Sequence, residues 1–272
     1  MFLQADVTEW LKRKELPIVD LVFGSPPYAE KGERYGFGGK WPTRRWVQWM
    51  ADITEGCVVV SRGYVVWVVN GAMKDGCYQP ACEGLVWILY QRGIICERPV
   101  IWWKNSIAFR NDWFKNEWEY VLAFKPKDRK CHFNWESVAV PPKYKSGGRF
   151  RQRTATGERK LGSEYPTNPL AHPSDIVRVT VGGGHMGHRL AHCNEAPFPL
   201  KLAEFFVKTC SKEGDTVLDP FCGSGTTAHA CYNLNRKWIG LDVRQSQIEL
   251  SERRMKDVCA NDCTTGEPKA SE

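Results

Sequence analysis

With 272 residues, of which 42% are hydrophobic, the chain is long enough to form one large α/β domain with an inserted lobe around a buried core. A formal net charge of +7 favours an anionic partner, nucleic acid first. No apolar run is long enough to cross a bilayer, and the first residues lack the basic and apolar segments of a secretory signal. The eleven cysteines include no Cys-x-x-Cys pair, which indicates free thiols in a reducing, cytoplasmic compartment.

The first half of the chain alternates between apolar runs and amphipathic stretches. Continuous apolar runs such as Tyr64–Val69 are typical of strands buried on both faces of a parallel sheet. Helical spacing of apolar residues predicts helices between them, and Thr43 is a suitable N-cap. The predicted strands are 18–23, 64–69, 100–103 and 120–124, and the predicted helices are 43–60 and 80–91.

The second half begins with a long break in this pattern. From Lys125 to about Glu195 the chain is rich in Pro, Gly, Arg, Lys and His and shows little periodicity, which is typical of a functional or disordered insertion. Order then returns, with predicted helices at 199–210, 226–234 and 245–258 and strands at 216–221 and 238–243.

This alternation predicts an α/β fold with a doubly wound, mostly parallel sheet and an inserted irregular region. The expected parts are an α/β part at 1–125, an insertion at 126–195, a second part of the same α/β domain at 196–260, and a polar tail at 261–272.

A glycine-rich turn follows the predicted strand at 216–221. It reads Asp-Pro-Phe-Cys-Gly-Ser-Gly-Thr-Thr over residues 219–227, and its glycines let the backbone approach a ligand closely. Asp242 ends the next strand, the position of an acid that binds ribose hydroxyls. Gly223, Gly225 and Ala228 also fit a dinucleotide fingerprint, so a nucleotide-binding oxidoreductase remains an alternative at this point.

A second motif, Ser25-Pro26-Pro27-Tyr28, follows the first predicted strand. The two prolines restrict the backbone, so that the Ser25 side chain and a main-chain carbonyl can point in one direction. Two such acceptors can localise the lone pair of a planar exocyclic amino group in the transition state of methylation. Tyr28 offers a ring on which a base can stack.

Together the two motifs resemble those of S-adenosylmethionine-dependent DNA amino-methyltransferases, and their order resembles the β group of that family. The stretch 197–202 resembles a further cofactor motif of the family. The resemblance implies S-adenosylmethionine as cofactor and Ser25, Pro26, Pro27 and Tyr28 as the base-binding, catalytic residues. The implied cofactor-binding residues are Asp6, Phe198, Pro199, Asp219, Phe221, Gly223, Gly225, Thr226, Thr227 and Asp242.

The resemblance also bears on the target base. Family members whose base motif begins with Ser lean towards N4-methylcytosine, whereas Asp is usual in enzymes that make N6-methyladenine. Ser25 therefore favours cytosine, with adenine as the alternative. A catalytically silent DNA-binding homologue and an enzyme that methylates RNA are further alternatives.

The insertion carries a run of basic residues that suits contacts to the phosphates of duplex DNA. In the β group this region recognises the target, and chemistry on a base in a duplex requires flipping the base out. The expected partners are double-stranded DNA and a separately acting restriction endonuclease; the glycine-rich loop 30–39 would close over the base. The DNA-binding residues are expected to be Lys143, Lys145, Arg149, Arg151 and Arg153.

A group of His and Cys residues within the insertion has loosely metal-like spacing, but the family resemblance implies no metal, and none is expected. The residues are His185, His188, His192 and Cys193.

Overall fold

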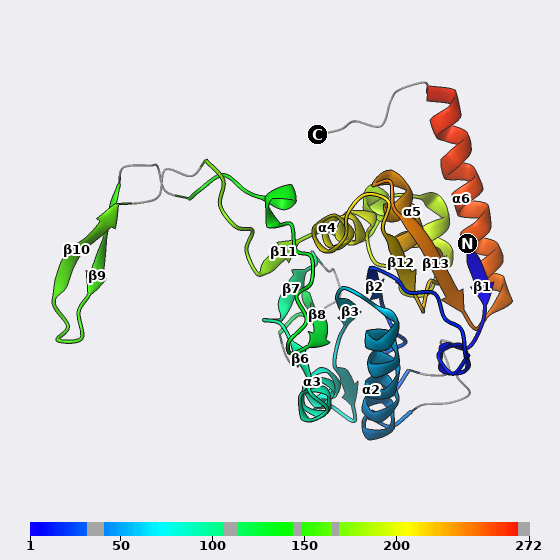
Figure 1. The fold of residues 1–272 in the computed structure, drawn as a ribbon, viewed down its shortest axis with the longest axis horizontal. Helices are drawn as coiled ribbons and strands as arrows, with labels where there is room; N and C mark the ends of the chain where they lie inside the picture. Colours follow the sequence, from blue (N-terminus) through cyan, green and yellow to red (C-terminus); the bar gives the residue numbers. More distant parts are fainter. Residues whose placement is uncertain (32–40, 106–113, 144–147, 165–168, 266–272) are drawn as a thin grey trace. The chain divides into compact units, whose positions relative to one another are not determined.

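A nine-stranded sheet forms the centre of the larger of two units in the computed structural model, which describes residues 1–31, 41–105, 114–143, 148–164 and 169–265 (Figure 1). This unit combines Met1–Phe133 with Asp175–Glu272, and the smaller unit is Asn134–Ser174. The strand order is β1 (Phe2–Gln4), β13 (Lys237–Asp242), β12 (Thr216–Asp219), β2 (Leu21–Gly24), β3 (Val65–Val69), β8 (Trp118–Pro126), β7 (Val100–Trp103) and β11 (Ile176–Arg178), with β6 (Ile94–Cys96) also paired to β8.

Neighbouring strands of this sheet are parallel except at β8, which runs antiparallel to β3, β6 and β7. From β12 the chain passes through α5 (Thr226–Asn233) to β13 on one side, and from β2 it passes through α2 (Thr43–Val60) to β3 on the other. The carboxyl ends of β2 and β12 therefore lie at a topological switch point, where open α/β sheets bind their ligands.

Helices cover both faces of the sheet because successive strand residues point to opposite faces. Val22 belongs to the core beneath α2 and α3 (Ala81–Gln91), whereas Leu21 and Phe23 belong to the core beneath α4 (Leu200–Cys210) and α5. Helix α6 (Gln245–Thr265) packs along β1 and β13.

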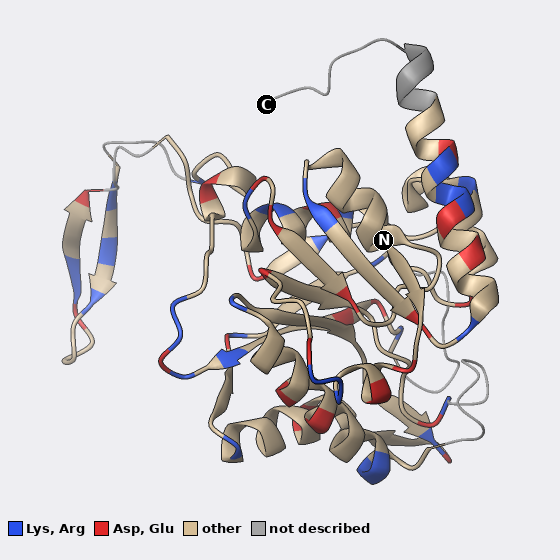
Figure 2. Ribbon diagram, turned by 45° about the vertical axis from the view of Figure 1, so that its right-hand side comes forward, with Lys and Arg blue, Asp and Glu red and all other residues tan. Residues whose placement is uncertain are grey.

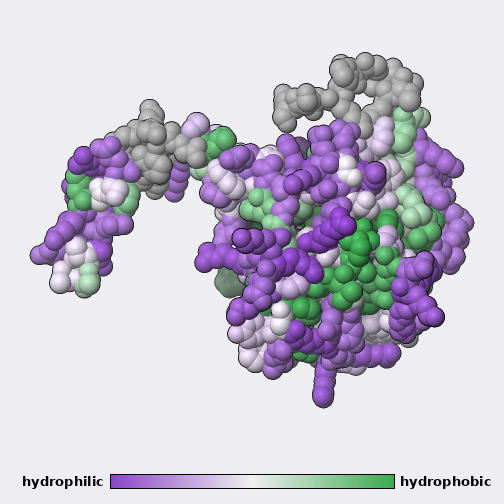
Figure 3. All heavy atoms as spheres, viewed as in Figure 1, coloured by the Kyte–Doolittle hydropathy of each residue, from purple (hydrophilic) through white to green (hydrophobic). Residues whose placement is uncertain are grey.

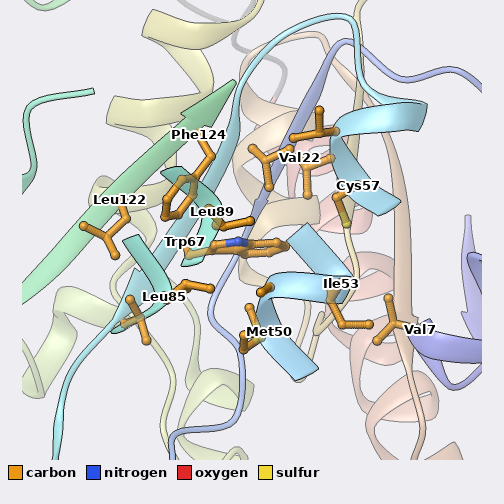
Figure 4. Close-up of a cluster of buried hydrophobic side chains, with 14 of the residues drawn as sticks. Val7, Val22, Met50, Ile53, Cys57, Trp67, Leu85, Leu89, Leu122 and Phe124 are labelled. Carbon is orange, nitrogen blue, oxygen red and sulfur yellow. The ribbon is translucent and has the colours of Figure 1, made fainter. Parts of the chain in front are cut away.

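Trp67 lies in the middle of the first core (Figure 4). It is fully buried among side chains of α2 and α3 such as Met50 and Leu85, and its indole Nε1 donates to Thr54 Oγ1 at 2.9 Å. The hydrogen bond satisfies the polar atom of an otherwise apolar side chain. This packing fixes the position of β3 against α2 and α3. The carboxyl end of β3 supports the Ser25–Tyr28 motif described below.

Several short elements complete the larger unit. These are α1 (Val7–Trp10), the hairpin of β4 (Ala72–Lys74) and β5 (Cys77–Gln79), and the 3₁₀ turns η3 (Gly183–Met186) and η4 (Arg189–Cys193). None of the helices that the structure describes is both long and apolar enough to span a membrane. The cysteines within the described ranges are all free.

The smaller unit contains a two-stranded antiparallel ribbon of β9 (Arg149–Arg153) and β10 (Arg159–Glu164) and the 3₁₀ turn η2 (Trp135–Val138). Figure 2 shows basic residues along both strands of the ribbon, and Figure 3 shows a largely hydrophilic surface over it.

The predicted α/β fold with a mostly parallel sheet is confirmed. Predicted helices and strands with long apolar patterns appear within a few residues of their expected ends, whereas the short strands β1, β4, β5 and β6 were missed. The first strand begins at Leu21 rather than at Ile18, which is 52% exposed.

The prediction of an irregular insertion over 126–195 was wrong in two respects. Residues 126–133 and 175–195 belong to the larger unit, because β11 pairs with β7 and buries Val177 in the second core. Residues 149–164 form the β9–β10 ribbon rather than irregular chain. The polar tail expected from residue 261 is helical as far as Thr265, and the rest of it lies outside the described residues.

Candidate active site

A cavity of about 620 Å³, including its opening to solvent, lies at the carboxyl ends of β1, β2, β12 and β13. The lining residues are Ala5, Asp6, Val7, Ser25, Pro26, Pro27, Tyr28, Asn194, Ala196, Pro220, Phe221, Gly223, Asp242, Val243 and Arg244.

All four residues of the Ser25–Tyr28 motif line this cavity. The Ser25 hydroxyl donates to the main-chain carbonyl of Val68 on β3 at 2.9 Å. A serine hydroxyl has one hydrogen and two lone pairs, so this bond leaves Oγ as an acceptor. The motif is also held from α2, where the buried indole of Trp46 donates to the Pro27 carbonyl at 2.6 Å.

The ring of Tyr28 is held by its hydroxyl. It donates to Glu119 Oε2 at 2.6 Å, and the other oxygen of Glu119 pairs with the ammonium group of Lys104. Glu119 lies on β8 and is only 7% exposed, and Lys104 follows β7, so two strands fix the position of one aromatic ring. Sequence reasoning missed both residues; the signal was an acid inside an apolar strand pattern.

Asp242 ends β13 and faces the same cavity. Its Oδ2 accepts from the main-chain N–H of Gly223 at 3.1 Å, and its Oδ1 accepts from that of Arg244 at 2.9 Å. Burial raises the pKa of the Asp242 carboxyl above its ordinary value, and the hydrogen bonds and the charge of Arg244 oppose this rise. The carboxylate is thus fixed in direction at the cavity wall.

The turn after β12 requires glycine at Gly223. Its φ is +48°, a conformation that side chains with a Cβ rarely adopt, and a Cβ there would lie 2.7 Å from Asn194 Nδ2. Glycine therefore lets residue 194 and the loop approach each other across the cavity wall.

Asp219 lies beneath the loop rather than on the cavity wall. Its Oδ1 accepts from the Phe221 N–H at 3.0 Å, and its Oδ2 accepts from Thr227 Oγ1 at 2.5 Å. Burial raises its pKa to about 7, against the effect of these hydrogen bonds. The carboxyl ties the start of the glycine turn to the first turn of α5.

Arg254 of α6 supports the same turn and is fully buried. Its Nη1 donates to the Ser224 carbonyl at 3.1 Å and to Thr226 Oγ1 at 3.0 Å. Burial lowers the pKa of its guanidinium to about 10. The sequence signal that was missed is an arginine within the buried i, i+3, i+4, i+7 stripe of Ser251, Arg254, Met255 and Val258.

The structure brings part of the predicted cofactor set to the cavity. Asp6, Phe221, Gly223 and Asp242 line it, and Asp6 also caps α1 by accepting from the Thr8 N–H at 2.7 Å. The predicted residues that do not line it are Phe198, Pro199, Asp219, Gly225, Thr226 and Thr227.

The motif at 197–202 does not line the cavity, and the residues just before it do so instead. Asn194 and Ala196 line the cavity, whereas Phe198 turns into the core and packs edge-on against Phe23 at 5.6 Å between ring centroids. Arg244 was also missed; it lines the cavity and pairs with Glu195 at 2.8 Å.

The predicted DNA-binding residues Lys143, Arg149, Arg151 and Arg153 lie in the smaller unit, and Lys145 lies outside the described residues. Most of the loop 30–39 is also outside them. Within the described ranges, no three His, Cys, Asp or Glu side chains gather as metal ligands would. His188 instead accepts from the Leu190 N–H at 3.2 Å.

Comparison with known proteins agrees with this geometry. A family model described as DNA methylase, for N6 and N4 methyltransferases, matches residues 19–253. The chain belongs to this DNA methylase family. Its members use S-adenosylmethionine to methylate exocyclic amino groups of DNA bases, so the expected family, enzyme class and cofactor are confirmed.

Three similar proteins illustrate the family. The type II methyltransferase M.BglII of Bacillus subtilis is 26% identical over 86% of this chain, and the match spans 62% of its own length. The DNA adenine methyltransferase YhdJ of Escherichia coli K12 is 23% identical over 95% of this chain and 83% of that protein. The fold of the cytosine-N4-specific PvuII DNA methyltransferase matches 98% of this chain and 93% of that one, with a TM-score of 0.69 and 19% identity.

The cavity of this family member fits the cofactor. Asp242 would offer carboxylate oxygens to ribose hydroxyls, and Gly223 lines the cavity beside it. Phe221 presents an apolar ring, packed between Trp49 and Trp67 at 5.8 Å from each. These residues would hold S-adenosylmethionine beside the Ser25 motif.

Proposed function

We propose that the protein is a site-specific DNA methyltransferase that methylates the exocyclic N4 amino group of a flipped cytosine. The observation that carries the proposal is the hydrogen bond from Ser25 Oγ to Val68, which leaves a hydroxyl acceptor in the cavity that also contains Asp242. The serine that opens the base motif favours cytosine over adenine.

The chemistry requires the amino nitrogen to become a nucleophile. Its lone pair is delocalised into the ring of the base and must be localised on nitrogen before a methyl group can be accepted. Ser25 Oγ and the Pro26 carbonyl would accept hydrogen bonds from the two N–H groups. These bonds would stabilise the pyramidal nitrogen of the transition state. The ring of Tyr28, held by Glu119, would stack on the base.

S-Adenosylmethionine, when bound, supplies an electrophilic methyl group. The residues of this chain then need to orient the base and receive one proton from the nitrogen after it has gained the methyl group. No strong base is needed before attack, because that proton becomes acidic once the nitrogen is cationic.

The smaller unit is proposed to bind the duplex through Lys143, Lys145, Arg149, Arg151 and Arg153. Each phosphate contact releases counterions. The logarithm of affinity therefore falls with the logarithm of salt concentration, with a slope proportional to the number of contacts. Neutralising Arg149, Arg151 and Arg153 together should flatten the salt dependence of DNA binding. An unaltered slope would show that the charges of these three arginines do not attract the duplex.

The second candidate is N6-methylation of adenine by the same residues, since the family includes both reactions. Both amino groups need the same pair of acceptors, so the mechanism would stay and only the base would change. Membership of the family leaves the nucleotide-binding oxidoreductase without support. A restriction endonuclease that cuts the same site is the proposed separate partner.

The test is transfer of a labelled methyl group from S-adenosylmethionine to mixed-sequence duplex DNA, with single-stranded DNA and RNA as competing substrates. We expect label in duplex DNA and little in RNA. Label in RNA alone would overturn the choice of nucleic acid, and no transfer by a protein that still binds the cofactor would indicate a silent DNA-binding homologue.

A further inference from the structure

The β9–β10 ribbon sorts its side chains onto two different faces. Residues directly opposite each other in an antiparallel pair share a face. Arg153 is opposite Arg159, and Arg151 is opposite Leu161, so these four share one face with Arg149. We call this set of five residues the arginine face.

The other face has a different character. Gln152 is opposite Lys160, and the ring of Phe150 lies over Gly162, where an added Cβ would meet it at 2.9 Å. Phe150 thus covers the backbone of the neighbouring strand. The two faces differ enough for one of them to be the binding surface.

The arginines of the arginine face differ in whether a carboxylate neutralises them. Arg149 pairs with Glu164 at 3.0 Å. Within the described residues, Arg151, Arg153 and Arg159 form no ion pair with a carboxylate. Arg153 and Arg159 are also directly opposite each other, and like charges so placed destabilise a ribbon that is at most marginally stable alone. An anionic partner would remove this repulsion.

Leu161 distinguishes reading of bases from simple phosphate binding. It is 59% exposed and lies opposite Arg151 on the arginine face. Phosphates offer nothing to an apolar side chain, whereas the major groove presents the thymine methyl group and, at guanine, two acceptors that match the fork of an arginine. A surface that mixes arginine with exposed leucine fits the edges of bases.

The dimensions of the ribbon also fit. The major groove is about 12 Å wide and admits a two-stranded ribbon. Alternate residues of a strand are about 6.8 Å apart, which corresponds to roughly two base-pair steps. Successive arginines of β9 can therefore address different base pairs.

We propose that the arginine face enters the major groove of the target duplex and that Arg151 reads a guanine of the recognition sequence. This inference rests on the proposed function, because it assigns a role in recognition to a chain that methylates DNA. Leu161 would contact a neighbouring apolar group, and Arg153 and Arg159 would gain anionic partners from the duplex.

The test uses the full-length protein and its Arg151→Lys variant, produced in cells that lack other DNA methylation. Single-molecule sequencing of their DNA maps the methylated motif. Arg151→Lys keeps the charge but loses the two-pronged contact, so we expect discrimination at one guanine of the motif to fall roughly tenfold to hundredfold. Lys160→Ala is the matched control, because it removes a charge from the opposite face of the same ribbon and should leave the motif unchanged.

Three results would overturn the inference. One is a wild-type motif with no guanine other than the partner of the methylated cytosine, and another is uniformly weaker methylation of an unchanged motif by Arg151→Lys, which would indicate a phosphate contact. The third is equal relaxation of the motif by Lys160→Ala. In all three the wild type still methylates DNA, so the proposed function stands. Absence of methylation by the wild type would overturn the proposed function, and with it the role of Arg151.

Discussion

The loops that follow β2 and β12 both end a buried strand at the same cavity, yet they use their residues differently. Every residue of the Ser25–Tyr28 loop lines the cavity. In the loop after β12, Pro220, Phe221 and Gly223 line it, whereas Asp219 and Thr227 are buried beneath it and hydrogen-bonded to each other.

The difference shows that a sequence motif mixes residues that contact a ligand with residues that hold the contacting ones. Prolines restrict the backbone of the first loop, and hydrogen bonds to Val68, Trp46 and Glu119 hold its three other groups in place at the cavity. The second loop is rich in glycine and is held by side chains from below, including Asp219 and the buried Arg254. Substitutions should separate these two kinds of residue.

The largest expected effect is on turnover in Ser25→Ala. Loss of one preorganised partner of the reacting group typically lowers kcat by about 10²–10³-fold. Cofactor affinity should stay near that of the wild type, because Ser25 acts on the amino group. Steady-state kinetics and calorimetric titration with S-adenosylmethionine measure the two quantities. Equal loss of both would mean that Ser25 supports the fold or the cofactor instead.

Asp242→Ala should act on the other side of the cavity and weaken cofactor binding. Removing a hydrogen bond to a charged group typically costs about 1.5–3 kcal/mol, which is roughly tenfold to hundredfold in the dissociation constant. The same titration measures it, with thermal unfolding as a check on the fold. An unchanged dissociation constant would exclude Asp242 from the ribose site.

Tyr28→Phe should have a smaller effect, because it keeps the ring and removes only the hydrogen bond to Glu119. We expect slower turnover and weaker stacking of the flipped base, measured with a fluorescent base at the target position. If the hydroxyl acts through Glu119, Tyr28→Phe and Glu119→Gln should be coupled by about 0.5–3 kcal/mol in a double-mutant cycle. Additive effects would separate the two residues.

Asp219→Asn should change the pH dependence of stability more than activity. With its pKa raised to about 7 by burial, Asp219 keeps a proton in the folded state that it loses near its ordinary pKa when unfolded. Its contribution to the free energy of unfolding is therefore largest at low pH and falls as pH rises towards 7. The stability difference between wild type and Asp219→Asn, from urea unfolding, should shift against the wild type between pH 5 and 8. A pH-independent difference would show that the carboxyl is not buried in this way.

The sequence allowed the parallel sheet and both motifs to be predicted, because buried strands such as Val65–Val69 are runs of apolar residues and the motifs are local. It did not allow the ribbon to be predicted, since alternating arginines in Arg149–Arg153 carry no apolar signal. Strand β11 has only three residues, and one of them, Val177, is buried.

The supporting residues of the site were harder to predict for a related reason. The roles of Glu119, Lys104 and Arg254 depend on contacts between segments far apart in the chain. Asn194 and Ala196 precede a motif whose own Phe198 is turned into the core. Such positions follow from packing rather than from spacing in the sequence.

Nucleoside mass spectrometry of duplex DNA methylated by the protein tests most directly whether Ser25 presents an acceptor to a cytosine amino group. We predict N4-methylcytosine as the product, lost in Ser25→Ala while the cofactor still binds. N6-methyladenine as the only product would contradict the assignment of the base to cytosine.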